Sequence, residues 1–302
     1  HMRWQMIFVL ALIIISASFV LAIFVFDDII DTVKQKFDIS SFILSALAYC
    51  GIILGIGNIG NYALLSINII LPTIIGIVAM IIFVYRQLNV EMPFLELRIL
   101  KNKEYMLSVL GSMVLYFVMM GSSIIVPLYV QTIKGMSATV SGLVTLPGSL
   151  LMAIVSPFAG KIYDILGMKK LFIAGALFML ISNVGMVFIP LSASVIIAGI
   201  LNAIRCISIG CLMMPLVTWG LSGIDAEDTP DGTALLTSLR TISGAIGSAI
   251  FVAIMTIVAE NSTASFGENA HIHGLNVTFA AMSCVTVILL FIAVFCIKEK
   301  NN

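Results

Sequence analysis

Charge is what this sequence of 302 residues has least of. Asp, Glu, Lys and Arg make up only 10% of it, hydrophobic residues make up 61%, and the mean hydropathy is +1.17. Apolar stretches of about 20 residues recur along the chain, more than a water-soluble core of this size can bury. The 15 basic and 15 acidic residues cancel, so the electrostatic footprint of a nucleic-acid-binding protein is missing. The composition predicts a polytopic membrane protein whose main partner is the lipid bilayer.

Motifs for metals, cofactors and nucleotides are missing as well. The five cysteines lie in apolar stretches without CxxC spacing, which argues against a zinc site or a disulfide framework. Without a Walker lysine motif, the sequence does not support ATP-driven transport. The letters GIGNIG at residues 55–60 match a dinucleotide fingerprint, but they end an apolar span and lack the strand-turn-helix context. We expect no metal, no cofactor and no enzymatic activity.

Nine apolar stretches are each long enough to cross about 30 Å of hydrocarbon as a helix. A period-two alternation typical of barrel strands is absent, so helices are the structure that lipid tolerates here. The expected spans are residues 5–26, 41–58, 64–85, 106–130, 138–159, 171–190, 193–221, 234–259 and 276–297. The predicted fold class is therefore all-α, with about nine membrane spans.

Lysine and arginine gather on one side of these spans. Alternation places eleven of them on the side of residues 160–170 and only Arg3 and Lys134 on the other. The eleven are Lys34, Lys36, Arg86, Arg98, Lys101, Lys103, Lys161, Lys169, Lys170, Lys298 and Lys300. By the positive-inside rule the larger group faces the cytoplasm, which predicts a multi-pass protein of the cell membrane with its C-terminus inside.

This orientation starts the first span outside the cell after only a few residues, with no earlier span to establish it. The chain also begins with His-Met. Both features favour the interpretation that the sequence is a piece of a longer protein or carries an added N-terminal remnant.

The stretch GKIYDILGMKK, residues 160–170, puts charge between two long apolar runs. Its residues Gly160, Asp164, Gly167, Lys169 and Lys170 resemble the loop signature of the major facilitator superfamily, which joins two helices on the cytoplasmic side. Gly160 would allow close helix approach or an exit turn, and Gly167 a positive φ. Asp164 would accept hydrogen bonds from free amides at a neighbouring helix N-terminus.

Two positions depart from this signature, because Ile165 and Met168 stand where a basic residue is usual. In this respect the stretch looks like the weaker copy found in the C-terminal half of such transporters. The alternative is an ordinary positive-inside loop.

Further stretches are similar to the fourteen-span drug:H+ antiporters of that superfamily. GTALLTSLRTISGAIGSAI at 232–250 resembles their penultimate span, and NAIRCISIGCLMMPLVTWGL at 202–221 resembles the span before it. The resemblance implies three parts: residues 1–60 with the last helix of the N-terminal half and a first inserted helix, 61–105 with a second inserted helix and a cytoplasmic linker, and 106–302 as the six-helix C-terminal half.

The function implied by this resemblance is export of hydrophobic or cationic drug-like compounds in exchange for protons. Alternating access would need two halves that rock about a site near the midplane. Five spans would be missing upstream, so the N-terminal half is an implied partner. The alternatives are a carrier of another small molecule on the same fold and a non-transporting membrane fragment.

Small residues and prolines point to close helix packing and to bends. Two small-xxx-small pairs in the eighth span would let backbones approach closely: Ser243 with Gly247 and Gly244 with Ser248. Prolines that interrupt helical hydrogen bonding inside spans would act as hinges or as static kinks. They are Pro147, Pro157 and Pro215.

Two arginines fall where charge is expensive. Arg205, near Asn202, is expected to have an interior role, and Arg240 is expected to extend toward the acidic residues at 225–231. The last six expected spans contain no mid-membrane Asp or Glu. A group that carries coupled protons is therefore predicted to lie outside them.

Overall fold

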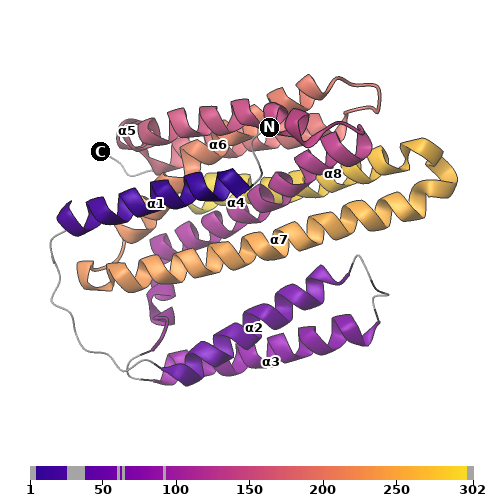
Figure 1. Cartoon of the computed structure of the whole chain (residues 1–302). Helices are drawn as coiled ribbons and strands as arrows, with labels where there is room; N and C mark the ends of the chain where they lie inside the picture. The colour runs from indigo at the N-terminus through magenta and orange to yellow at the C-terminus, as the bar shows by residue number, and fades with distance from the viewer. Residues whose placement is uncertain (1–4, 26–37, 60–61, 63–64, 91–92, 298–302) are drawn as a thin grey trace. The chain divides into compact units, whose positions relative to one another are not determined.

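The computed structural model describes residues 5–25, 38–59, 62, 65–90 and 93–297 and divides the chain into two units, residues 1–37 and 38–302 (Figure 1). In the first unit, α1 (Gln5–Val25) is an uninterrupted apolar helix of 21 residues. Lys34, Lys36, Arg3, Lys298 and Lys300 lie outside the described residues, so their predicted placement stays a prediction.

The second unit is built from helices, and its described residues contain no strand. Its long helices are α2 (Ile39–Gly57), α3 (Ile67–Asn89), α4 (Lys103–Leu128), α5 (Ala138–Val187), α6 (Val195–Leu221), α7 (Thr229–Phe266) and α8 (Ala270–Phe291). Short helical turns join or extend them: η1 (Leu97–Lys101), η2 (Tyr129–Ile133), η3 (Ala226–Asp228), η4 (Gly267–Asn269) and η5 (Ile292–Cys296). The chain is therefore all-α over its described residues.

Within the described residues, eight helices are long and apolar enough to cross a membrane, where nine spans were expected. The difference lies in α5, which joins the expected spans 138–159 and 171–190 into one run of 50 residues. Its backbone leaves helical geometry at Gly167, with φ 75° and ψ 164°. The expected loop at 160–170 was too long, because residues 160–166 include good helix formers and continue the helix to the glycine.

Helices α4 to α8 pack into one bundle around a shared core. The α5 helix packs mainly on α6, α4 on α7, and α8 on both α5 and α7. Buried hydroxyl groups add contacts between neighbouring helices: the Ser208 hydroxyl donates to the Gly175 carbonyl at 2.6 Å, and the Ser182 hydroxyl to the Leu201 carbonyl at 2.6 Å. Hydrogen bonds from neutral hydroxyl groups therefore hold α5 and α6 in register.

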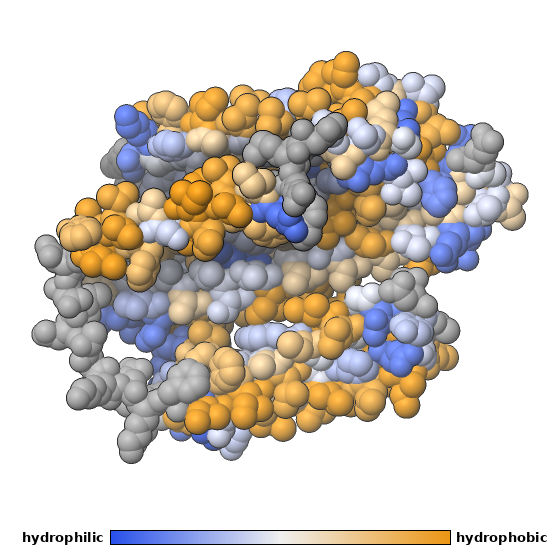
Figure 2. All heavy atoms as spheres, in the orientation of Figure 1, coloured by the Kyte–Doolittle hydropathy of each residue, from blue (hydrophilic) through white to orange (hydrophobic). Residues whose placement is uncertain are grey.

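Helices α2 and α3 form an antiparallel hairpin (Figure 1). A Cβ atom at Gly51 would lie 2.7 Å from the Cα atom of Gly76, so the two backbones touch. At one end, Arg86 forms an ion pair with Asp38 at 3.1 Å. Figure 2 shows apolar side chains along the hairpin. Phe42 and Ile81 are among the exposed apolar residues of its two helices, as a lipid-facing surface requires.

The segment from 93 to 105 attaches the hairpin to the bundle. Leu95 and Ile99 are buried with Phe83 of α3, Tyr105 of α4 and residues of α7 in a second, smaller core. The Tyr105 hydroxyl donates to the Gly232 carbonyl at 2.7 Å. The part expected to be a linker therefore joins α3 to the beginnings of α4 and α7.

Candidate functional site

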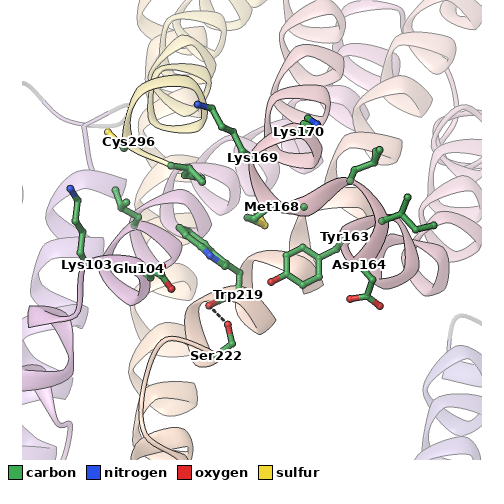
Figure 3. Close-up of a pocket in the computed structure, with 15 residues that line it drawn as sticks. Lys103, Glu104, Tyr163, Asp164, Met168, Lys169, Lys170, Trp219, Ser222 and Cys296 are labelled. Carbon is green, nitrogen blue, oxygen red and sulfur yellow. Dashed lines mark hydrogen bonds between the residues drawn. The ribbon is translucent and has the colours of Figure 1, made fainter. Parts of the chain in front are cut away.

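A cavity of about 750 Å³ opens where several helices end (Figure 3). It is lined by the start of α4, the break in α5, the last turn of α6 and the end of η5. Residues 163–170 supply about half of its lining, so most of the predicted loop signature borders this cavity.

The break at Gly167 determines how the signature is presented. The positive φ is one that residues with a side chain rarely adopt, and nothing lies within 4 Å of the position a Cβ would take. Met168, directly after it, is 6% exposed and packs into the main core. The second segment of α5, residues 168–187, therefore starts from an anchored residue, with Lys169 and Lys170 at its first turn.

Asp164 and Gly160 do not make the contacts expected from the sequence. Asp164 is exposed, and its carboxylate accepts no hydrogen bond within the described part of the chain, so it caps no helix in this conformation. Figure 3 shows that it points away from the lysines. Gly160 is an exposed helical residue with open space around it, so it provides neither close approach nor an exit turn. The reason for both is that the helix continues past Gly160 to Gly167.

Arg205 occupies the interior of the bundle, as expected. It is 1% exposed, its Nη2 donates to the Asn202 Oδ1 at 2.6 Å, and its guanidinium lies 5.7 Å from the centre of the Phe279 ring. Gly148 of α5 makes room for Asn202, since a Cβ there would lie 2.8 Å from the Asn202 Nδ2. The buried Arg205 Nη1 has no hydrogen-bond partner in the described structure. One nitrogen of the buried guanidinium is therefore left without a hydrogen-bond partner among the described residues.

Arg240 does not reach the acidic residues at 225–231 that were expected to attract it. Its guanidinium lies 4.8 Å from the centre of the Tyr116 ring of α4, and the ion pairs found within the described residues are Arg86–Asp38 and Arg98–Glu96. The expectation was wrong because the ring face of Tyr116 offers a nearer favourable surface for a cation in this apolar setting.

The small residues of α7 lie against α4. The Ser243 hydroxyl donates to the Met113 carbonyl at 2.9 Å, Gly244 faces Met120, and the Gly247 backbone meets that of Phe117. Ser248 instead donates to the Ala245 carbonyl of its own helix. The first three therefore permit close packing of the two helices.

The three predicted hinge prolines lie inside helices. Pro147 and Pro157 are exposed in the first segment of α5, residues 138–166, while Pro215 is buried in α6. Their role as hinges stays a prediction.

Basic residues gather at the end of the bundle that holds the cavity. Lys103, Lys169 and Lys170 line it, and Arg98 and Lys101 lie in η1, directly before α4. At the opposite end, Lys134 donates to the carbonyls of Leu191 and Ala193. Among the described residues, no three His, Cys, Asp or Glu side chains lie close enough together to hold a metal.

Sequence reasoning missed the charged end of the α2–α3 hairpin. Asp38 is the N-cap of α2, and Ser41 donates to its carboxylate through both its amide and its hydroxyl. These hydrogen bonds, with those from Arg86, hold the pKa of Asp38 below its ordinary value. The only signal in the sequence was an acid before one apolar stretch and a base at the end of the next.

A family model described as Major Facilitator Superfamily matches residues 3–248. The chain belongs to the major facilitator superfamily. Among relatives of this facilitator chain, the Bacillus subtilis protein called lincomycin resistance protein LmrB is 34% identical over 84% of the chain. The B. subtilis MFS-type transporter YcnB is 28% identical over 99% of the chain, and the Clostridioides difficile riboflavin transporter RibZ is 26% identical over 100% of the chain.

The facilitator chain spans only part of these relatives: 54% of LmrB, 63% of YcnB and 65% of RibZ. The predicted superfamily is confirmed, and membership among transporters indicates transport rather than catalysis. The eight apolar helices among the described residues and the transporter relatives likewise indicate a multi-pass membrane protein.

Proposed function

We propose that this chain is part of a secondary transporter that exports drugs or other hydrophobic compounds across the cytoplasmic membrane in exchange for protons. The observation that carries the proposal is the 34% identity to a lincomycin resistance protein over 84% of the chain. A shorter match, 25% identical over 63% of the chain, is to the multidrug export protein EmrB of Escherichia coli.

In this proposal α4 to α8, with the break at Gly167, supply the six spans of one transporter half. The other half would come from protein beyond these 302 residues, and the two would alternate about a midplane site. The exposed carboxylate of Asp164 has no partner within the described residues, so it is free to accept hydrogen bonds from that half. We place the end of the bundle that holds the cavity, and the C-terminus, in the cytoplasm, because lysines gather at that end.

The proton-carrying group belongs to the other half in this account. From Tyr105 to Ile224 the sequence has one acidic residue, Asp164, and it lies at an end of the bundle rather than inside it. Arg205 is buried but its guanidinium does not give up its proton under ordinary conditions. A titratable carboxylate for coupling is therefore expected elsewhere.

The test is efflux from proteoliposomes under an imposed pH gradient. The chain alone is expected to give none, and the chain with the other half is expected to export lincomycin or a cationic dye. Asp164→Asn should slow export about tenfold, since one charge-assisted hydrogen bond is worth about 1.5 to 3 kcal/mol. Asp225→Asn, an exposed acid that does not line the cavity, is the control. Saturable efflux from the chain alone, or equal rates in both variants, would contradict the proposal.

Riboflavin transport is a second candidate, favoured by the similarity to RibZ along the whole chain. The same proteoliposomes distinguish the two. Riboflavin movement without lincomycin or dye movement would select this candidate and reject drug export.

A further inference from the structure

The cavity at the α5 break combines an apolar floor with lysine at its edge. Leu107, Met168 and Ile297 are buried residues of the floor, and Trp219 is half-buried beside them. Lys103 of α4 and Lys169 of α5 both line the cavity although 66 residues of sequence separate them. The fold therefore brings two cations to one apolar hollow.

These two lysines have unused donors. Within the described residues neither ammonium group has a hydrogen bond or an ion pair. Figure 3 shows both extending to one side of the cavity, while the carboxylates of Glu104 and Asp164 extend to the opposite side. The cavity is thus divided into a cationic side and an anionic side, and an anionic group has one side to occupy.

The position of the cavity matches the boundary between hydrocarbon and water. The apolar helices α4, α6 and α8 begin or end at it, and tryptophan and lysine are the residues enriched at that level of a bilayer. Basic pockets between transmembrane helices at this level bind phospholipid head groups. A free anion would contact only the lysines and not the apolar residues of the cavity.

Two side chains beside the break decide between a lipid and a free anion. Ile165 is 80% exposed and Leu166 is 47% exposed, and both line the cavity. Inorganic phosphate makes no favourable contact with these exposed apolar side chains, whereas the acyl chains of a lipid can cover them. The hollow therefore has a place for the phosphate and a place for the chains.

We propose that this cavity binds an anionic phospholipid, with the phosphate between Lys103 and Lys169 and the acyl chains against Ile165, Leu166 and Trp219. The lipid would come from the leaflet at this end of the bundle. Bound there, it would touch both segments of α5, since Leu166 precedes the break and Lys169 follows it.

Trp219 supplies a direct test, because Trp4 is the only other tryptophan and a Trp4→Phe variant leaves one fluorophore. The chain is reconstituted in unlabelled phosphatidylcholine containing a small fixed fraction of brominated lipid, either phosphatidylglycerol or phosphatidylcholine. Bromine quenches tryptophan at short range. We expect stronger quenching by brominated phosphatidylglycerol, since the cavity would concentrate it next to Trp219.

Matched variants test the lysines. Lys103→Gln and Lys169→Gln should each lower the relative affinity for phosphatidylglycerol about fivefold, the effect of about 1 kcal/mol per cation near a membrane surface. Lys161→Gln is the control, because Lys161 is exposed on α5 and does not line the cavity. Circular dichroism of each variant verifies that the helices are intact, and Lys103→Arg should restore the preference.

Three outcomes would overturn the proposal. Equal quenching by the two brominated lipids would show no anionic lipid site, and an effect of Lys161→Gln as large as that of Lys103→Gln would show a diffuse surface charge. Loss of the preference in millimolar inorganic phosphate, at matched ionic strength, would show a free-anion site. No outcome depends on efflux, so this proposal and the transport proposal fail separately.

Discussion

In the α2–α3 hairpin two backbones touch at Gly51 and Gly76, whereas in the α4–α8 bundle hydroxyl groups such as Ser208 reach across to the carbonyl of the next helix. The hairpin depends on having no side chain at its backbone contact and on polar contacts near one end, where the Arg86–Asp38 ion pair lies beside a buried hydrogen bond from Gln87 to the Ser41 hydroxyl. The bundle depends on a large core and on buried polar contacts shared among five helices. A single added methyl group that clashes with the backbone should therefore destabilise the hairpin, while removal of a buried side chain should destabilise the bundle.

The largest expected effect is a cavity in the bundle. Arg205→Ala should lower the free energy of unfolding by about 3 kcal/mol, because it removes a large buried side chain from between Asn202 and Phe279. Arg205→Met fills most of the space without a buried charge and should leave the stability unchanged or higher. Thermal unfolding in detergent measures both. A larger loss of stability in Arg205→Met than in Arg205→Ala would mean that the charge of Arg205 itself stabilises the bundle.

A clash in the hairpin should come next. A Cβ atom at Gly76 would lie 2.5 Å from the Ile52 amide nitrogen, so Gly76→Ala should push α2 and α3 apart at a cost of about 2 to 3 kcal/mol. The control is Gly57→Ala, which has nothing within 4 Å of its new methyl group. Cross-linking of a cysteine pair placed across the hairpin reports the separation, and equal yields in both variants would refute the backbone contact.

The break in α5 should be affected less. Gly167→Ala forces a side chain into a positive φ and should cost about 1 to 2 kcal/mol, since the space around it is open and only the backbone is strained. Gly142→Ala lies in the same helix with open space and ordinary geometry, so it should be neutral or slightly stabilising. Thermal unfolding compares the two. Identical midpoints would mean that the break relaxes freely.

The smallest effect concerns the charged end of the hairpin and pH. The hydrogen bonds from Ser41, with Arg86, lower the pKa of Asp38 below 3.8. A carboxyl whose pKa is lower in the folded state contributes stability above the unfolded pKa, and this contribution is lost as pH falls through the folded pKa. The thermal unfolding midpoint should therefore fall as the pH drops below about 4, and Asp38→Asn should remove the part of that fall that Asp38 causes. A pH response that persists in the variant would point to another group.

The sequence predicted the helical class, the family and a positive φ at Gly167, because long apolar runs and a glycine near a lysine pair are local signals. The ion pair of Asp38 and Arg86 was not predicted, because the two residues are 48 positions apart and meet only once the hairpin forms. The same holds for Arg240 over Tyr116. Local sequence showed the acids after residue 224 but not the ring of another helix. Asp164 was predicted as a cap from a loop that is in fact helix.

The central claim is that the lysine-rich end of the bundle faces the cytoplasm. The proposed direction of transport and the leaflet that supplies the lipid both depend on it. Single cysteines at Met136 and Lys161, both exposed and at opposite ends, can be labelled with a membrane-impermeant thiol reagent in a cysteine-free background on intact cells. We predict labelling at position 136 in intact cells and at position 161 only after permeabilisation. Labelling at 161 but not at 136 in intact cells would contradict the account.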